Sequence, residues 1–309
     1  MRDIQTRRTR VATARYVVWL VGVLAPLLAS FPPAAIECLR DRAACLSINE
    51  SEKSNRGEDL SLVSVITAPV KHNGVLNVSY QRHKRIRNTA QAQSVRSSRQ
   101  AIIGIVDELN KQLALPFDVN VSLEKCNDAD AYYDQVSHTV MVCYELLDSY
   151  YHLFSPVVRG RAKMDEAVTG AAVSVFLHEL GHAVIDAWDL PITGREEDAA
   201  DQFATLLMIN GLDDGERMAL NGARSFELLG NLEKGQAKFY WDEHSTDKQR
   251  FYDEICLIYG HNPDKYDYLH KDGTLPAGRA DLCEEDYARL RKSWQTLLSP
   301  YVQKGLLNF

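Results

Sequence analysis

The stretch that decides the fold is residues 178–204, HELGHAVIDAWDLPITGREEDAADQFA. It opens with an HExxH pattern inside a segment, Met164–Ala187, whose apolar residues recur at helical spacing. Residues four apart lie on one face of a helix, so His178 and His182 can bind one metal ion together. Glu179 would lie at the same cleft, close enough to take a proton from water at the metal. Zinc suits this arrangement, because Zn²⁺ accepts nitrogen and oxygen ligands and keeps a position open. The alternative is a surface helix with two ordinary histidines.

A third ligand is expected from the acidic run that follows. A second helix is predicted over Arg195–Leu212, and in it Glu197 and Asp201 are four apart and share a face. Glu197 is the predicted third metal ligand, and Asp201 is predicted to accept the second N–H of a ligand histidine, which fixes its tautomer. Glu196 and Asp198 are rival ligands from the same run, although acids at a helix N-terminus are also favoured by the helix dipole.

Three further features lie outside this stretch. His244 is a candidate catalytic residue, because a histidine near the metal can stabilise the oxyanion formed when water attacks a carbonyl; a surface or capping role is the alternative. Arg250 could act in the same way, but a structural pair with an acid is favoured. The region Thr139–Tyr144 could be an edge strand that holds a substrate backbone by strand addition, or an ordinary strand before a helix beginning at Glu145.

The composition indicates a globular protein. The chain has 309 residues, 45% hydrophobic and 25% charged, and no long uncharged apolar run after the N-terminal segment, which excludes a multi-pass membrane protein. The net charge of −7 argues against general nucleic-acid binding. Strand-like alternation before residue 144 and helical spacing after it predict an α+β fold: a small β-sheet region followed by a mostly helical body that carries the HExxH helix.

The N-terminus has the layout of a secretory signal. Five arginines precede Tyr16–Ala29, an uncharged apolar run of 14 residues, and small residues and prolines follow. We therefore expect residues 1–35 to be a signal peptide, or a membrane anchor if they are not cleaved, and the protein to be secreted or periplasmic. Removing them takes away five Arg and one Asp, so the charge changes from −7 to −11. Residues 36–95 are expected to be a polar segment with short strands, and residues 96–309 the domain that carries the HExxH motif.

The cysteines fit an exported protein. All six lie after the apolar run, and an even number in an exported chain favours disulfides. Six cysteines allow 15 pairings. We expect nearest neighbours to pair, as Cys38–Cys45, Cys126–Cys143 and Cys256–Cys283.

The stretch 178–204 resembles a bacterial metallopeptidase family that is itself a domain of unknown function. More broadly it is similar to gluzincins, whose third ligand lies in an ExxAD-type motif, here Glu197-Asp198-Ala199-Ala200-Asp201. The resemblance extends from about Gln100 to Pro300. It implies that residues 96–309 form a metallopeptidase-like domain with a zincin-like fold. It also implies that His178 and His182 are zinc ligands, Glu179 the general base and Glu197 the third ligand, and it supplies no substrate.

These features predict zinc-dependent hydrolysis of peptide bonds in a peptide or protein substrate, with water activated by Glu179. No nucleic-acid partner is expected, and no membrane contact beyond an N-terminal anchor. A zinc-binding but non-hydrolytic envelope or partner-binding protein is the alternative, although such a protein has no need of Glu179. A hydrolase of small amides is a third hypothesis.

Overall fold

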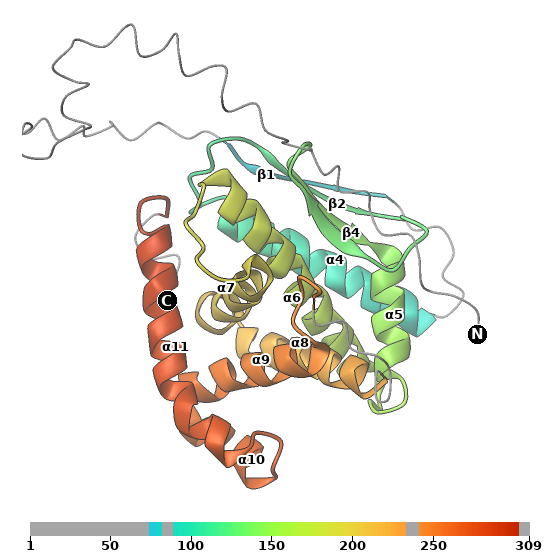
Figure 1. Ribbon diagram of the computed structural model, residues 1–309. Helices are drawn as coiled ribbons and strands as arrows, with labels where there is room; N and C mark the ends of the chain where they lie inside the picture. The colour runs from blue at the N-terminus through green and yellow to red at the C-terminus, as the bar shows by residue number, and fades with distance from the viewer. Residues whose placement is uncertain (1–73, 82–88, 233–240, 303–309) are drawn as a thin grey trace, which may run out of the picture. The chain divides into compact units, whose positions relative to one another are not determined.

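The structure is a computed structural model, and it describes residues 74–81, 89–232 and 241–302 (Figure 1). The chain divides into two compact units, residues 1–68 and 69–309, and all described residues belong to the second. The expected signal segment 1–35, the pair Cys38–Cys45 and most of the segment 36–95 lie outside the described residues.

A four-stranded sheet forms the β region. It consists of β1 (Leu76–Tyr80), β2 (Val119–Glu124), β3 (Ala131–Asp134) and β4 (Thr139–Cys143), in the order β1-β2-β4-β3. β1, β2 and β4 are parallel, and β3 runs antiparallel to β4. Of the two alternatives for residues 139–144, the edge strand is therefore wrong, and the ordinary strand before a helix is confirmed, with the helix beginning at Tyr144. β4 has a neighbour on both sides because the chain turns back at Asp134, and β3 takes the edge.

One face of the sheet is buried. Val119, Val121 and Leu123 of β2 are inaccessible to solvent, and they alternate with more exposed residues of the same strand. This period of two places the apolar side chains on one face. The helices α4 (Thr89–Leu109) and α6 (Arg161–Ala187) pack against strands of this sheet, so the core lies between the sheet and these helices (Figure 1).

The other helices complete the body. They are α5 (Tyr144–Phe154), α7 (Glu196–Gly211), α8 (Gly215–Leu232), α9 (Asp247–His261), α10 (Pro263–Lys271) and α11 (Ala277–Leu298). α6 and α7 confirm, within a few residues at each end, the helices predicted over Met164–Ala187 and Arg195–Leu212. α10 begins at Pro263, where the missing N–H of proline costs nothing, and Asn262 caps this end of the helix. The α+β fold class is confirmed.

The HExxH helix α6 is the central helix of the body. It packs against α4, α5, α7 and α8 as well as the sheet. Among the described helices, α6 is long and apolar enough to cross a membrane, but 83% of its most apolar window is buried in the protein. Its hydrophobicity is therefore that of a core helix.

A glycine brings α6 and α7 close together. A Cβ at Gly181 would lie 3.1 Å from Cα of Ala200 and 3.3 Å from its Cβ. The small residues at this crossing allow the two backbones to approach, which places the start of α7 over the histidines of α6.

Two of the expected disulfides are present. Cys126–Cys143 joins the loop after β2 to the end of β4, and Cys256–Cys283 joins α9 to α11. Both pairings confirm the nearest-neighbour prediction, and no cysteine in the described ranges is free.

Candidate metal centre

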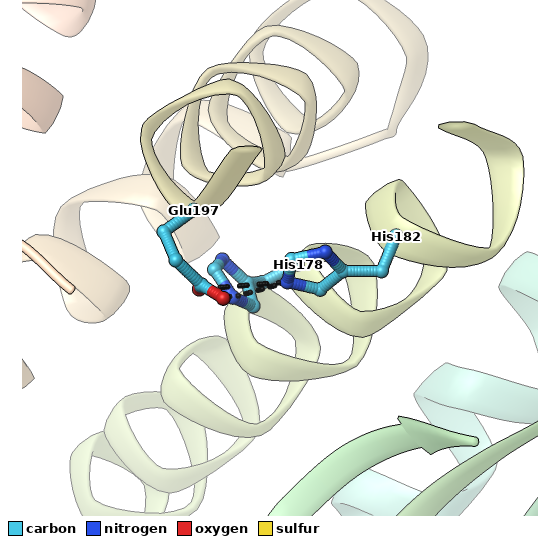
Figure 2. Close-up of side chains that lie close together, drawn as sticks. All are labelled: His178, His182 and Glu197. Atoms are coloured by element: carbon cyan, nitrogen blue, oxygen red, sulfur yellow. Dashed lines mark hydrogen bonds and ion pairs between the residues drawn. The ribbon is translucent and has the colours of Figure 1, made fainter. Parts of the chain in front are cut away.

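Three donor groups meet where α7 begins above α6. Figure 2 shows the rings of His178 and His182, from α6, directed at the carboxylate of Glu197, from α7. The two Nε2 atoms are 3.2 Å apart, and Glu197 Oε2 lies 3.1 Å from Nε2 of His178 and 3.5 Å from that of His182. All three donors lie within 4.8 Å of one another, a group that can hold a metal ion.

Each histidine of this group has a carboxylate at its other nitrogen. Nδ1 of His178 lies 2.7 Å from Asp201 Oδ1, and Nδ1 of His182 lies 2.7 Å from Glu196 Oε1. An Nδ1–H donated to a carboxylate leaves Nε2 as the free lone pair, the tautomer that a metal ligand needs. In each histidine, Nδ1 is therefore held by a carboxylate and Nε2 is available to bind a metal.

Asp201 is held by an arginine as well as by His178. Arg250, on α9, donates from Nε to Asp201 Oδ2 at 2.7 Å and from Nη2 to Oδ1 at 2.5 Å, and its guanidinium stacks over Phe226. Burial alone would raise the pKa of Asp201, but the charge of Arg250 and the bond to His178 hold it below the ordinary value. Asp201 is thus an ionised acceptor that fixes the orientation of His178.

The protonation of the metal-free group follows from its contacts. Burial lowers the pKa of His182, but hydrogen bonds with Glu197 and Glu196 outweigh it and raise the pKa to about 9. Burial would raise the pKa of Glu197, yet the three nearby histidines hold it far below the ordinary value. Without a metal, a proton on an imidazole therefore supplies the positive charge that Glu197 requires.

Glu179 lies on α6 beside the group and is not one of its three donors. It is 8% exposed, and burial raises its pKa although His178 and His182 oppose the shift. A carboxylate with a raised pKa in a buried site has the basicity that a general base needs.

The comparisons with known proteins identify the family. A family model described as "Putative metallopeptidase" matches residues 80–298, which is more than half of the chain. The chain belongs to this metallopeptidase family. No curated protein and no solved structure matches it.

The metallopeptidase family implies a metal. Of the acids of the run, Glu197 is the one whose carboxylate lies beside Nε2 of both histidines. The rival ligand Glu196 faces Nδ1 of His182 instead. The rival Asp198 accepts a hydrogen bond from Ser245 Oγ at 2.8 Å. The sequence offered Glu196 as a rival ligand or as an acid favoured by the helix dipole, and its place as the partner of His182 was missed.

His244 lies at the side of the group. Its Nε2 is 3.0 Å from Glu197 Oε2, and its side chain is 44% exposed. The backbone N–H of His244 donates to Asp242, whose carboxylate also lies 3.4 Å from Nδ1. A second group of possible ligands, Glu197, Glu243 and His244, shares Glu197 with the first and is mostly exposed.

Asp130 is a further residue near the centre that sequence reasoning missed. It precedes the edge strand β3, and its charge interacts with those of His244 and Glu179. Burial raises its pKa, and its carboxylate accepts the backbone N–H of Ala131. The edge strand of the sheet therefore begins next to the candidate metal centre.

Proposed function

We propose that this protein is an exported zinc peptidase of the gluzincin type, with His178, His182 and Glu197 as the metal ligands. The distances between the donors carry the proposal. Ligands about 2.0–2.1 Å from a tetrahedral zinc ion are about 3.3 Å apart. The three donor separations, 3.1, 3.2 and 3.5 Å, match the edges of such a tetrahedron.

The donor set supports zinc over other ions. Two imidazoles and one carboxylate suit Zn²⁺, whereas Ca²⁺ and Mg²⁺ prefer oxygen ligands. Zinc held here would supply Lewis-acid polarisation of the scissile carbonyl and would lower the pKa of the attacking water. Three protein ligands leave one position open for that chemistry, which separates a catalytic from a structural zinc site.

The chain's own residues would move the protons and stabilise charge. Glu179 would take the proton of the attacking water and pass it to the leaving amine, and its raised pKa fits both transfers. His244, with Nε2 next to Glu197 and an exposed side chain, would donate a hydrogen bond to the oxyanion. Asp201 and Glu196 would hold the ligand histidines in place.

The edge strand supports a peptide or protein as substrate. Cys143 N donates to Asp130 O, so by the alternation of an antiparallel pair Ala131 and Tyr133 direct their backbone groups away from β4. No described strand pairs with this outer edge. An extended peptide could add there beside the metal centre. The two disulfides, which persist in oxidising compartments, support a secreted or periplasmic location.

The first test is the metal content of the purified chain. We expect one equivalent of zinc in the wild type and much less in Glu197→Ala, whereas Asp198→Asn, one residue further along α7, should keep it. Zinc retained by Glu197→Ala would move the third ligand elsewhere. No zinc in any of the three after reconstitution would refute the metal site.

The second test separates hydrolysis from zinc binding alone. We expect the wild type to cleave members of an unstructured peptide library, and Glu179→Gln to keep zinc and lose cleavage. A wild type that binds zinc and cleaves nothing in this library would favour the non-hydrolytic envelope or partner-binding protein.

A further inference from the structure

A side-chain contact joins the edge strand β3 to the HExxH helix α6. Tyr133, on β3, donates from Oη to Asp186 Oδ2, on α6, at 2.8 Å. Asp186 follows His178 and His182 along α6 at the same spacing of four residues, so it extends the face that carries the two histidines. The edge strand is therefore tied to α6 about one helical turn beyond the candidate metal centre.

A histidine completes this contact. Nδ1 of His138, in the turn between β3 and β4, lies 3.2 Å from Tyr133 Oη and 3.6 Å from Asp186 Oδ2. The His138 ring stacks on that of Phe117, with the ring centroids 3.9 Å apart. Because the phenol has one proton and donates it to Asp186, His138 contacts the phenol oxygen as a donor. The three side chains form a chain of hydrogen bonds that ends on α6, and each fixes the orientation of the next.

Tyr133 is suited to be a fixed donor. Its ring packs against the main core, whereas the neighbouring Tyr132 lies on the opposite face of the sheet and is 45% exposed. Burial raises the pKa of Tyr133, and the hydrogen bond and the charge of Asp186 add to this, so the phenol keeps its proton. Hydrogen bonds from an O–H to a charged carboxylate are among the stronger ones in proteins.

The strand β3 has few other attachments to the body. It consists of four residues, and it pairs with β4 on one side only. Among the described residues, the bond from Tyr133 is the one hydrogen bond that joins a β3 side chain to a helix. The height of this strand above α6 therefore depends on its pairing with β4 and on the contact between Tyr133 and Asp186.

We propose that Tyr133 is a positioning residue for the peptide substrate and that it acts through Asp186. The inference rests on the proposed function, in which a peptide adds to the outer edge of β3. The backbone of Tyr133 would bind the peptide, while its side chain would fix the distance between this edge and the metal ligands of α6. Without the bond to Asp186, the three metal donors would stay in place, but β3 and the peptide could shift relative to them. A displacement of about 1 Å can reduce catalysis about 100-fold.

Steady-state kinetics of Tyr133→Phe test the proposal, with the peptide of the unstructured library that the wild type cleaves fastest. We expect kcat to fall about 10- to 100-fold and KM to change less than about threefold, because the peptide still binds but is misplaced. The zinc content should equal that of the wild type. Tyr132→Phe is the matched control, since it removes a hydroxyl from the same strand on the opposite face of the sheet, and it should keep wild-type kinetics.

The partner on α6 provides a second test. Asp186→Asn keeps an acceptor oxygen for Tyr133 and should retain most of the wild-type kcat. Asp186→Leu removes the acceptor and should reproduce the loss seen in Tyr133→Phe. The double variant Tyr133→Phe/Asp186→Leu should lose little more than either single variant, because both substitutions break the same contact. Losses that multiply in the double variant would show that the two residues act independently, which overturns the proposal.

The remaining outcomes separate this inference from the proposed function. If the wild type binds zinc and cleaves no peptide, the proposed hydrolysis fails and the positioning role fails with it. If the wild type cleaves and Tyr133→Phe keeps kcat within about twofold, the positioning role alone is overturned. The same holds if Tyr132→Phe loses as much activity as Tyr133→Phe. Loss of zinc from Tyr133→Phe would also overturn it, because the contact would then support the metal centre and not the edge strand.

Discussion

The floor and the rim of the candidate metal centre are built differently. The floor is His178 and His182 on α6 with Glu197 on α7, and their side chains are 5%, 14% and 17% exposed. The rim is the loop of residues 241–246, where the His244 side chain is 44% exposed. The floor is held by the packing of two helices and by the carboxylates at Nδ1 of each histidine. The rim is held by hydrogen bonds from the backbone of His244 to Asp242 and from Ser245 to Asp198. In the proposed function, the floor would hold the metal and the rim would contact the substrate.

The largest expected effect separates these roles at His244. In His244→Ala we expect the zinc content to be unchanged and kcat to fall about 100- to 1,000-fold, because an oxyanion donor is lost. His244→Gln, which keeps an N–H donor, should recover part of the loss. Metal analysis and steady-state kinetics check both variants. Loss of zinc from His244→Ala would instead make His244 part of the floor.

A pH titration of zinc affinity examines the floor alone. The pKa of His182 is raised to about 9 in the metal-free protein, so below this pH zinc must displace a proton. Affinity should therefore rise about tenfold per pH unit from pH 7 and level off near pH 9, a change of about 100-fold. Competition with a chelator measures it.

Glu196→Gln sharpens the same titration. It removes the charge of one partner of His182, which should lower the pKa of that histidine and move the plateau to lower pH. A zinc affinity that does not change between pH 7 and 8 would contradict the protonated floor.

A smaller effect is expected behind the floor, at Asp201. Asp201→Asn keeps the size of the side chain and one acceptor oxygen, but it removes the charge that orients His178. Zinc affinity should fall about 10- to 100-fold, as for other outer partners of metal ligands. Asp198→Asn, one turn earlier on α7, is the matched control and should bind zinc normally. Equal zinc affinities of the two variants would show that Asp201 acts only in folding.

The sequence predicts the floor well because helix geometry is local. The spacing of four residues in HExxH and between Glu197 and Asp201 defines shared faces without knowledge of the fold. The break after residue 190 indicates that two helices meet. The structure adds what spacing cannot, namely that Glu196 faces Nδ1 of His182 while Glu197 faces Nε2.

The features that the sequence does not predict depend on contacts between distant segments. β3 lies on the outer side of β4 and not between β4 and β2, so β3 and not β4 is the edge strand. Both arrangements fit the same alternation of polar and apolar residues. Arg250 is 49 residues from Asp201, so the sequence predicts a pair with an acid but does not identify which acid it is.

The smallest expected effect tests the packing that joins the two halves of the floor. In Gly181→Ala, the new Cβ would lie 3.1 Å from Cα of Ala200, so α7 must shift by a few tenths of an ångström. We expect unfolding by denaturant to show a loss of about 1–3 kcal/mol, as in other overpacked cores. Zinc affinity should fall with it, since Glu197 would move with α7 away from α6.

Gly104→Ala is the matched control, because it lies inside α4 and nothing is within 4 Å of its added Cβ. There the substitution should stabilise the protein by up to about 1 kcal/mol through helix propensity. Opposite signs at two helical glycines would show that the close approach of α6 and α7 fixes the metal centre. Equal stabilisation at both would mean that α7 adapts freely, and that the floor is held by its hydrogen bonds to Asp201 and Glu196 instead.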